Sequence, residues 1–216
     1  KIQISPTTLA TRPLAKAYTK RTFGFTRMIK GYIIYLPDYD NSVSMARRAY
    51  ESGTTHGWDL TLFEGVNGQK DYLQNHNVRI YNKSKKAKRL MERPGTAGCF
   101  LSQYLLWQQC FISQTAMCIF EHDVIFKKPM GNVELCDVYK FEGFKKAKPT
   151  PTGVWYEGAR AYLLRPSGAK KLLDWVHENG AMPADWMLND GIVEMKFDLN
   201  EKVTYKSDKM SFTKDL

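Results

Sequence analysis

Residues 31–63 read GYIIYLPDYDNSVSMARRAYESGTTHGWDLTLF, and this stretch determines the fold class. The continuous apolar run at 31–36 is typical of a strand that is buried on both faces, as in a parallel sheet. A helix capped by Asn41 or Ser42 is predicted to follow, and a second strand comes at 58–63. A strand, a helix and another strand in this order predict a β-α-β unit of the mononucleotide-binding kind.

The rest of the chain continues this alternation. The apolar face of residues 98–114 predicts a helix, and a second helix capped by Ser167 is predicted near the C-terminal end. Three further runs are predicted to be strands: 116–120, 137–141 and 161–164. Helices that alternate with strands indicate an α/β protein with a mostly parallel sheet. The polar tail after Ile192 predicts no regular element. We therefore expect one domain at 31–216, preceded by a basic arm at 1–30.

The composition supports one domain with a buried core, since 43% of the 216 residues are hydrophobic. No apolar run approaches the roughly 18 residues that cross a bilayer, and residues 1–16 lack the apolar stretch of a secretory signal. The four cysteines have no CxxC spacing and are expected to be reduced and buried. These features predict a protein that has no transmembrane segment. They also predict that the protein is located in the cytoplasm, or in the host cytoplasm if it is viral.

The charge is strongly basic and unevenly distributed. Lys and Arg outnumber Asp and Glu by 32 to 22, which gives a net charge of +10. Residues 1–30 hold seven basic residues and no acid. A second cluster consists of Lys83, Lys85, Lys86, Lys88 and Arg89. Either cluster alone is typical of a solvated face, but two such clusters favour an anionic partner, because they raise its local concentration.

Two acids follow the predicted strand at 116–120. Glu121 and Asp123 stand at its carboxyl end, where ligands collect in open α/β sheets. Two carboxylates in these places can share one Mg²⁺ or Mn²⁺ ion, whose other ligands would be donor phosphates. The alternative is a pair of solvated loop acids with Lys127 or Lys128 as a partner.

Four blocks of sequence extend the argument beyond the acid pair. They are GTAGCFLSQYLLWQQC (95–110), IFEHDVIF (119–126), EGARAYLLRPSGAKKLL (157–173) and PADWML (183–188). Together, and in this order, they resemble the pattern of glycosyltransferase family 25. The stretch GYIIYLPDYDNSVSMARRAY (31–50) is similar in kind to the opening strand and helix of that family but lacks its usual Arg-rich turn. The resemblance covers roughly residues 31–190. The Glu-His-Asp form of the acid motif also resembles that of bacteriophage glycosyltransferase-like proteins.

This resemblance implies a GT-A type, Rossmann-like domain, a nucleotide-diphosphate sugar as donor and, usually, inversion at the anomeric carbon. It implies that Glu121 and Asp123 bind Mn²⁺ or Mg²⁺ and the diphosphate. It makes Asp185 the candidate base that accepts the proton of the acceptor hydroxyl; taken alone, Asp185 would be interpreted as a helix cap. The resemblance also assigns three residues to the nucleotide pocket: Tyr35, Leu36 and Pro37.

The sequence departs from the family pattern at two positions. Gln103 follows Ser102 where the family usually has His, which puts an acid-base or acceptor role for that position in doubt. His122 replaces the middle acid of the metal motif, where a turn residue is the simplest interpretation. The outer acids remain intact, so we expect the metal site to persist with an altered metal preference or dependence.

Three interpretations of the acceptor remain open. Transfer to a hydroxymethylated base in phage DNA would use both basic clusters to contact phosphates and aromatic residues to receive an extruded base. Transfer to lipopolysaccharide or another glycan is the commoner activity of the bacterial family. The third interpretation is a non-catalytic nucleic-acid-binding module, against which the intact Glu121 and Asp123 argue. The sequence-based preference is for DNA.

Overall fold

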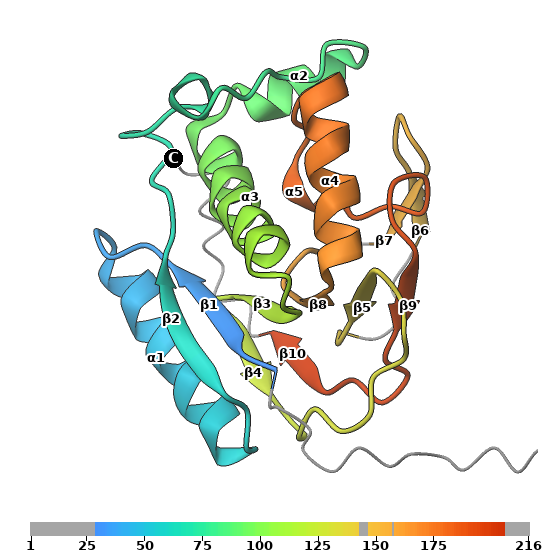
Figure 1. Cartoon of the computed structure of the whole chain (residues 1–216). Coiled ribbons are helices and arrows are strands. Elements are labelled where there is room, and N and C mark those ends of the chain that lie inside the picture. The colour runs from blue at the N-terminus through green and yellow to red at the C-terminus, as the bar shows by residue number, and fades with distance from the viewer. Residues whose placement is uncertain (1–28, 143–146, 157, 206–216) are drawn as a thin grey trace, which may run out of the picture.

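The computed structural model describes residues 29–142, 147–156 and 158–205 (Figure 1). Its central sheet has six strands in the order β2-β1-β3-β8-β5-β9. These strands are β1 (Gly31–Tyr35), β2 (Leu60–Glu64), β3 (Met117–Glu121), β5 (Val138–Lys140), β8 (Ala161–Leu164) and β9 (Met195–Phe197). β1 pairs in parallel with β2 and β3, and β5 pairs in parallel with β9, whereas β8 is antiparallel to β3 and β5. The predicted α/β fold with a mostly parallel sheet is confirmed.

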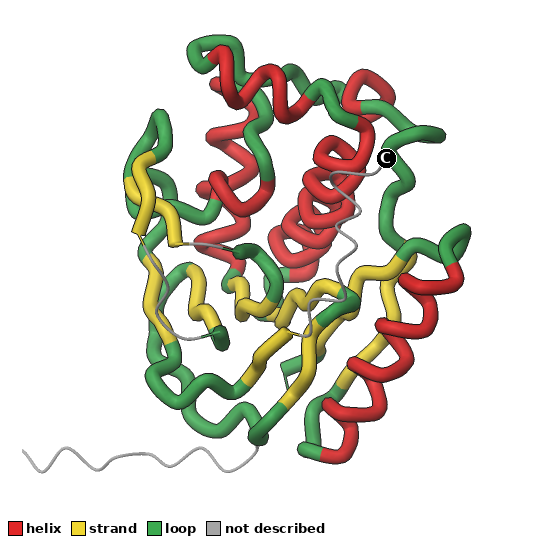
Figure 2. Tube along the Cα trace, turned by 180° about the vertical axis from the view of Figure 1, so that it is seen from behind, coloured by secondary structure: helices red, strands yellow, loops and turns green. Residues whose placement is uncertain are grey.

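Helices cover both faces of this sheet. α1 (Asp40–Thr55) lies on one face, and α3 (Pro94–Ser113) and α4 (Pro166–Asn179) pack side by side on the other (Figures 1 and 2). The smaller elements are η1 (Leu73–His76), α2 (Lys85–Met91), α5 (Ala184–Met187), the β6–β7 hairpin (Ala147–Pro149, Val154–Tyr156) and the antiparallel pair β4–β10 (Val124–Phe126, Val203–Tyr205).

Alternate residues of the strands face two separate core clusters. In β3, Ile119 packs with residues of α3 and α4, whereas Cys118 and Phe120 pack with residues of α1 and of the β4–β10 pair. This alternation follows from the two-residue period of a strand. Because both faces are covered, β3 is apolar throughout until it reaches Glu121. Burial of a side chain such as Phe120 contributes roughly 1.5–3 kcal/mol to folding.

The predicted helix caps Asn41 or Ser42 and Ser167 are wrong, because each helix begins before the residue that was predicted to cap it. α1 begins at Asp40 with Tyr39 as the N-cap, and the Ser42 hydroxyl accepts the Leu36 N–H at 2.9 Å. α4 begins at Pro166, and the Ser167 hydroxyl donates to Asp137 at 2.7 Å. Both serines therefore connect their helix to a neighbouring segment.

The polar tail after Ile192 contains β9 and β10, which the sequence pattern did not predict. Each has three residues, which is too short for a clear period. The predicted basic arm lies mostly at residues 1–28, outside the described residues, so the domain boundary stays a prediction. None of the described helices has both the length and the hydropathy needed to span a membrane.

Candidate functional site

The two predicted metal ligands lie at the carboxyl end of β3. Glu121 is the last residue of the strand, and Asp123 stands in the turn that leads to β4. The Glu121 N–H donates to the carbonyl of Arg160 at 2.8 Å, which fixes the start of β8 beside the acid pair. Both acids are partly buried, with 28% and 22% of their side chains exposed.

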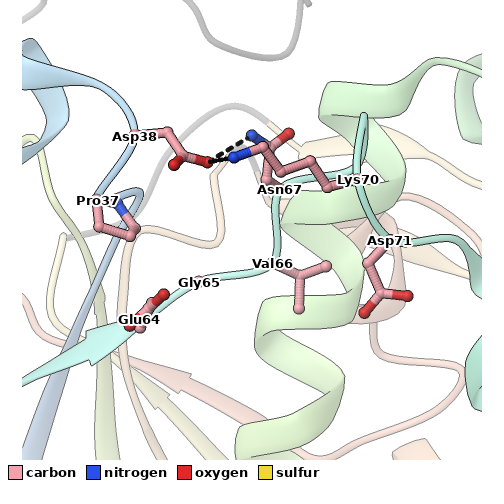
Figure 3. Close-up of a pocket in the computed structure, with 8 residues that line it drawn as sticks. All are labelled: Pro37, Asp38, Glu64, Gly65, Val66, Asn67, Lys70 and Asp71. Carbon is pink, nitrogen blue, oxygen red and sulfur yellow. Dashed lines mark hydrogen bonds and ion pairs between the residues drawn. The ribbon is translucent and has the colours of Figure 1, made fainter.

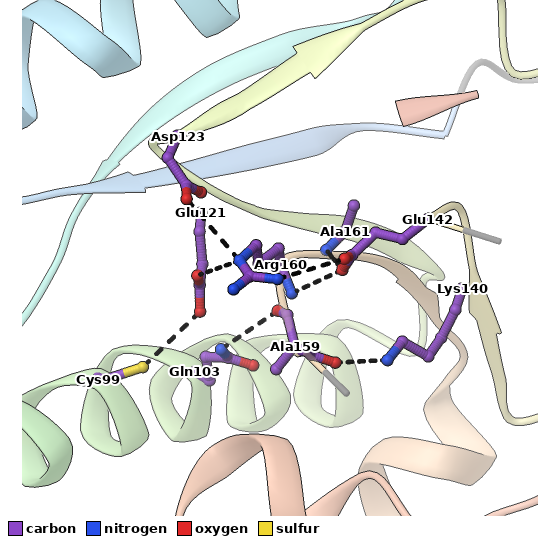
Figure 4. A network of polar contacts seen from close by, with 10 residues as sticks. Cys99, Gln103, Glu121, Asp123, Lys140, Glu142, Ala159, Arg160 and Ala161 are labelled. Carbon is purple, nitrogen blue, oxygen red and sulfur yellow. Dashed lines mark hydrogen bonds and ion pairs between the residues drawn. The ribbon is translucent and has the colours of Figure 1, made fainter. Parts of the chain in front are cut away.

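The charged partner of this pair is Arg160 and not one of the predicted lysines. The Arg160 Nε lies 3.9 Å from Glu121 Oε2 and 3.8 Å from Asp123 Oδ2 (Figure 4). Lys127 and Lys128 are exposed, and the Lys128 ammonium donates to the carbonyl of Asn200. The alternative interpretation gave Lys127 or Lys128 as the partner of the acid pair. That part of it is wrong, because the partner is Arg160.

A third carboxylate lies behind Arg160. The buried Glu142 accepts the backbone N–H groups of Arg160 and Ala161 through Oε1, at 3.1 and 3.2 Å. Its Oε2 lies 3.7 Å from the Arg160 guanidinium. The buried Lys140 donates to the carbonyl of Gly158. Backbone and side-chain bonds together hold the start of β8 in one place (Figure 4).

The environment of the acid pair favours the addition of positive charge. Burial, followed by the charge of Asp123, raises the pKa of Glu121 to about 8, and Arg160 only partly opposes the shift. Burial also raises the pKa of Asp123. Asp123 Oδ1 is buried and has no hydrogen-bond partner among the described residues. Such an oxygen is an available ligand, since a buried polar atom is normally satisfied.

The acid pair therefore fits a hard divalent cation. No third His, Cys, Asp or Glu in the described parts of the chain joins the pair in a metal-binding group. Mg²⁺ and related ions are commonly held by one or two carboxylates, with substrate phosphates and water as the other ligands. The two carboxylates are sufficient for that arrangement.

Asp185 lies near the same acids although it is distant in sequence. It is the second residue of α5, whose N-cap is Pro183, so it is not the N-cap residue. Its charge contributes to the raised pKa values of Glu121 and Cys99. Burial raises the pKa of Asp185 itself to about 6. Asp185 thus lies within electrostatic range of Glu121.

His122 connects the acid motif to the first turn of α1. Its Nδ1 lies 3.2 Å from the hydroxyl of Ser42, which also accepts the Leu36 N–H. Burial, followed by the charge of Arg48, lowers the pKa of His122 to about 4, so the ring is neutral near pH 7. The residue that replaces the middle acid is thus a neutral contact between the turn after β3 and α1.

Gln103, which stands where the family usually has His, is part of a buried hydrogen-bond chain. Trp107 donates to the Tyr162 hydroxyl at 2.8 Å, which donates to Gln103 Oε1 at 2.7 Å. The Gln103 amide donates to the carbonyl of Ala159 at 3.4 Å, directly before Arg160. Gln103 is fully buried, so its role in this structure is to position the segment that carries Arg160.

A cavity of about 410 Å³ lies beyond the carboxyl ends of β1 and β2 (Figure 3). Its lining consists of Pro37, Asp38, Glu64, Gly65, Val66, Asn67, Lys70 and Asp71. Of the three predicted nucleotide-pocket residues, only Pro37 is among them. Tyr35 packs against the core on the α1 side, and the backbone of Leu36 is bonded to Ser42.

Five of the eight lining residues are polar residues that the sequence analysis did not select. Asp38 accepts from Lys70 at 2.7 Å and from Asn67 at 3.0 Å, and Glu64 ends β2. Asp38 follows β1 and Glu64 ends β2, and this position at the end of a strand was the sequence signal that could have identified them. Arg160 and Glu142 were also missed, because their proximity to Glu121 depends on the antiparallel pairing of β8.

The predicted basic cluster lies on and just before α2. All five of its residues are exposed, namely Lys83, Lys85, Lys86, Lys88 and Arg89. The Lys86 ammonium lies 5.3 Å from the ring centroid of Trp186, the residue after Asp185. The basic helix is thus adjacent to the element that carries the candidate base.

Comparisons with known proteins identify the family. In the structural comparison, the chain is similar to the apo-form glycosyltransferase GlyE of Streptococcus pneumoniae TIGR4, with a TM-score of 0.41 and 14% identity. That similarity covers 78% of this chain and 44% of the other, so this chain spans less than half of its length. No curated protein matches the sequence. The model of glycosyltransferase family 25, described as an LPS biosynthesis protein, matches residues 28–147, which include the acid pair. The chain belongs to glycosyltransferase family 25.

Proposed function

We propose that this glycosyltransferase moves a sugar from a nucleotide-diphosphate donor to an acceptor hydroxyl, with the diphosphate bound beside Glu121 and Asp123. One observation carries the proposal: a partly buried acid pair with an unpartnered oxygen, Asp123 Oδ1, lies at the same edge of the sheet as a cavity lined by several polar residues. The cavity would hold the nucleotide, because ligands bind beyond the carboxyl ends of strands in α/β sheets.

Glu121 and Asp123 would hold Mn²⁺ or Mg²⁺ in this arrangement. When bound, such an ion supplies positive charge to the diphosphate leaving group as the glycosidic bond breaks. Glu121 would release its proton on binding the ion, because metal ligands must be deprotonated. His122 would keep the turn that carries Asp123 against the first turn of α1.

Asp185 would accept the proton of the acceptor hydroxyl. With a pKa of about 6 it is mostly ionised near pH 7, and it is a stronger base than a carboxylate at its ordinary pKa. Its charge acts on Glu121, which supports its assignment to the same site. An attacking hydroxyl between the donor sugar and α5 would lie within its reach.

For the acceptor we propose an anionic glycan. The exposed lysines of α2 would contact its acidic groups, and Lys86 links α2 to the segment that holds Asp185. The description of the family, LPS biosynthesis protein, favours a glycan. A hydroxymethylated base in DNA is the second candidate acceptor, and the same exposed lysines favour it. The tests below distinguish the two acceptors.

The direct test is a transfer assay with matched acceptors. Nucleotide-diphosphate sugars with different bases and sugars are combined with a phosphorylated oligosaccharide, its phosphatase-treated form and a duplex with hydroxymethylcytosine. We expect acceptor-dependent release of the nucleoside diphosphate with the phosphorylated oligosaccharide, and less with the treated form. Transfer to the duplex alone would select the DNA candidate, and no acceptor-dependent release in any combination would contradict the proposed function.

A salt titration separates the two acceptor candidates through binding. If α2 contacts duplex phosphates, log affinity for DNA falls linearly with log salt, with a slope of about −0.9 per phosphate contacted. Replacement of Lys85 and Lys88 by Gln would then flatten the slope. Lys170→Gln on α4, where Lys170 pairs with Asp174, is the matched control. Millimolar or weaker DNA binding at low salt, unchanged by the α2 substitutions, would exclude DNA.

A further inference from the structure

Arg160 occupies an unusual position among three carboxylates. Its distances of 3.8 and 3.9 Å to Asp123 and Glu121 exceed the roughly 2.7–2.9 Å of a charge-assisted hydrogen bond. The guanidinium therefore interacts with the acids mainly through its charge and leaves their oxygens available. The unpartnered Asp123 Oδ1 agrees with this interpretation.

The backbone and one aromatic ring hold this cation in place. The Arg160 carbonyl accepts the Glu121 N–H, and the Arg160 N–H donates to Glu142. The guanidinium carbon lies 4.1 Å from the ring centroid of Tyr205 in β10, a cation–π distance. The side chain is still 26% exposed, so an anion from solvent can reach it.

We propose that Arg160 is a resident cation of the donor site, which binds the diphosphate of the donor directly and competes electrostatically with the divalent ion for Glu121 and Asp123. This inference rests on the proposed function, because it assigns a further residue to the same site. The structure assigns Arg160 here by geometry, because its Nε lies within 4 Å of both acids.

Such a cation has opposite effects on the two ligands of the site. A positive charge a few ångströms from the acid pair repels an incoming Mn²⁺ and attracts an incoming diphosphate, and both effects are large in a partly buried site. Removal of the charge should therefore strengthen the binding of the cation and weaken that of the anion. A purely structural role predicts no such opposition, because a distorted site binds both ligands more weakly.

The experiment compares Arg160→Gln with two control variants. Arg160→Lys keeps the charge. Arg165→Gln removes a guanidinium at the opposite end of β8, where Arg165 contacts the carbonyl of Glu134. Calorimetry measures the affinity for Mn²⁺ alone and then for inorganic pyrophosphate at saturating Mn²⁺. Thermal unfolding and near-ultraviolet circular dichroism verify the fold of each variant.

We expect Arg160→Gln to bind Mn²⁺ about tenfold more tightly than the wild type and pyrophosphate about tenfold more weakly. Arg160→Lys and Arg165→Gln should stay within about threefold of the wild type for both ligands. If the folded Arg160→Gln variant changes both affinities in the same direction, or neither, the inference is overturned while the metal site of the proposed function stands. If no variant and no wild-type protein binds Mn²⁺ at millimolar concentration, the metal part of the proposed function fails, and the inference fails with it.

Discussion

Asp123 and Asp137 are two buried or partly buried aspartates next to strands of the same sheet, and their surroundings differ completely. Asp137 accepts from Ser167 at 2.7 Å, from Lys171 at 2.5 Å and from the Glu194 N–H at 3.0 Å. Asp123 has one oxygen without any hydrogen-bond partner among the described residues.

The pKa values of these two acids move in opposite directions. Burial alone would raise the pKa of Asp137, but the bonds from Lys171 and Ser167 outweigh burial and lower it. Burial raises the pKa of Asp123, and Arg160 does not compensate. Asp137 is thus satisfied by the fold itself, whereas Asp123 is left with unused binding capacity. This difference separates an acid that stabilises the structure from an acid that is available to a ligand.

The largest expected effect is on transfer in variants of the acid pair. Asp123→Asn removes a negative ligand from the diphosphate site, and we expect the transfer rate to fall by about 10³-fold or more. Addition of Mn²⁺ after chelation should restore transfer by the wild type but not by the variant. Thermal unfolding should stay near that of the wild type, because the fold does not satisfy this carboxylate. Full transfer by the variant in excess chelator would remove Asp123 from the metal site.

The second effect concerns Asp185, which combines burial with a raised pKa. Asp185→Asn keeps the shape of the side chain but cannot accept a proton, so turnover should fall roughly 10²–10⁴-fold. Donor affinity, measured by calorimetry with the nucleoside diphosphate, should be retained. A collapse of donor affinity with unchanged single-turnover chemistry would instead place Asp185 in the donor site.

Asp137→Asn tests the acid that the fold itself satisfies, and we expect it to affect stability and not transfer. Loss of the charged bonds to Ser167 and Lys171 should lower the free energy of unfolding by about 1–3 kcal/mol. The transfer rate per folded molecule should stay near that of the wild type. Denaturant unfolding and an assay corrected for the folded fraction measure the two quantities. A large loss of transfer in the folded variant would show that the two acids are not functionally distinct.

The last expected effect is the dependence of stability on pH. The folded-state pKa of Glu121 is about 8, above its ordinary value of 4.5, so the folded state binds more protons between these values. Stability should therefore fall as the pH rises through that window, by at most roughly 1.4 kcal/mol per pH unit from this one group. Glu121→Gln should flatten the slope. Asp137 contributes with the opposite sign: its stabilisation is present above pH 3.8 and is lost as the pH falls through its lower folded-state pKa.

The same contrast separates what could be predicted from the sequence from what could not. The apolar runs at 31–36 and 116–120 predicted buried strands, because a strand covered on both faces must be apolar throughout. The acids at the end of the second run were visible in the sequence, but their assignment to a metal site also needed the family resemblance. Local pattern and composition thus determined the α/β class and the order of the main elements.

Only the tertiary structure decided which groups meet these acids. Arg160 reaches Glu121 through the antiparallel register of β8 and β3, and Asp185 reaches the same place through the packing of α5. Ser42 and Ser167 were predicted as caps but bond to other segments. Register and packing depend on the whole set of long-range contacts, whereas a sequence pattern reports only the burial of each segment along its own length.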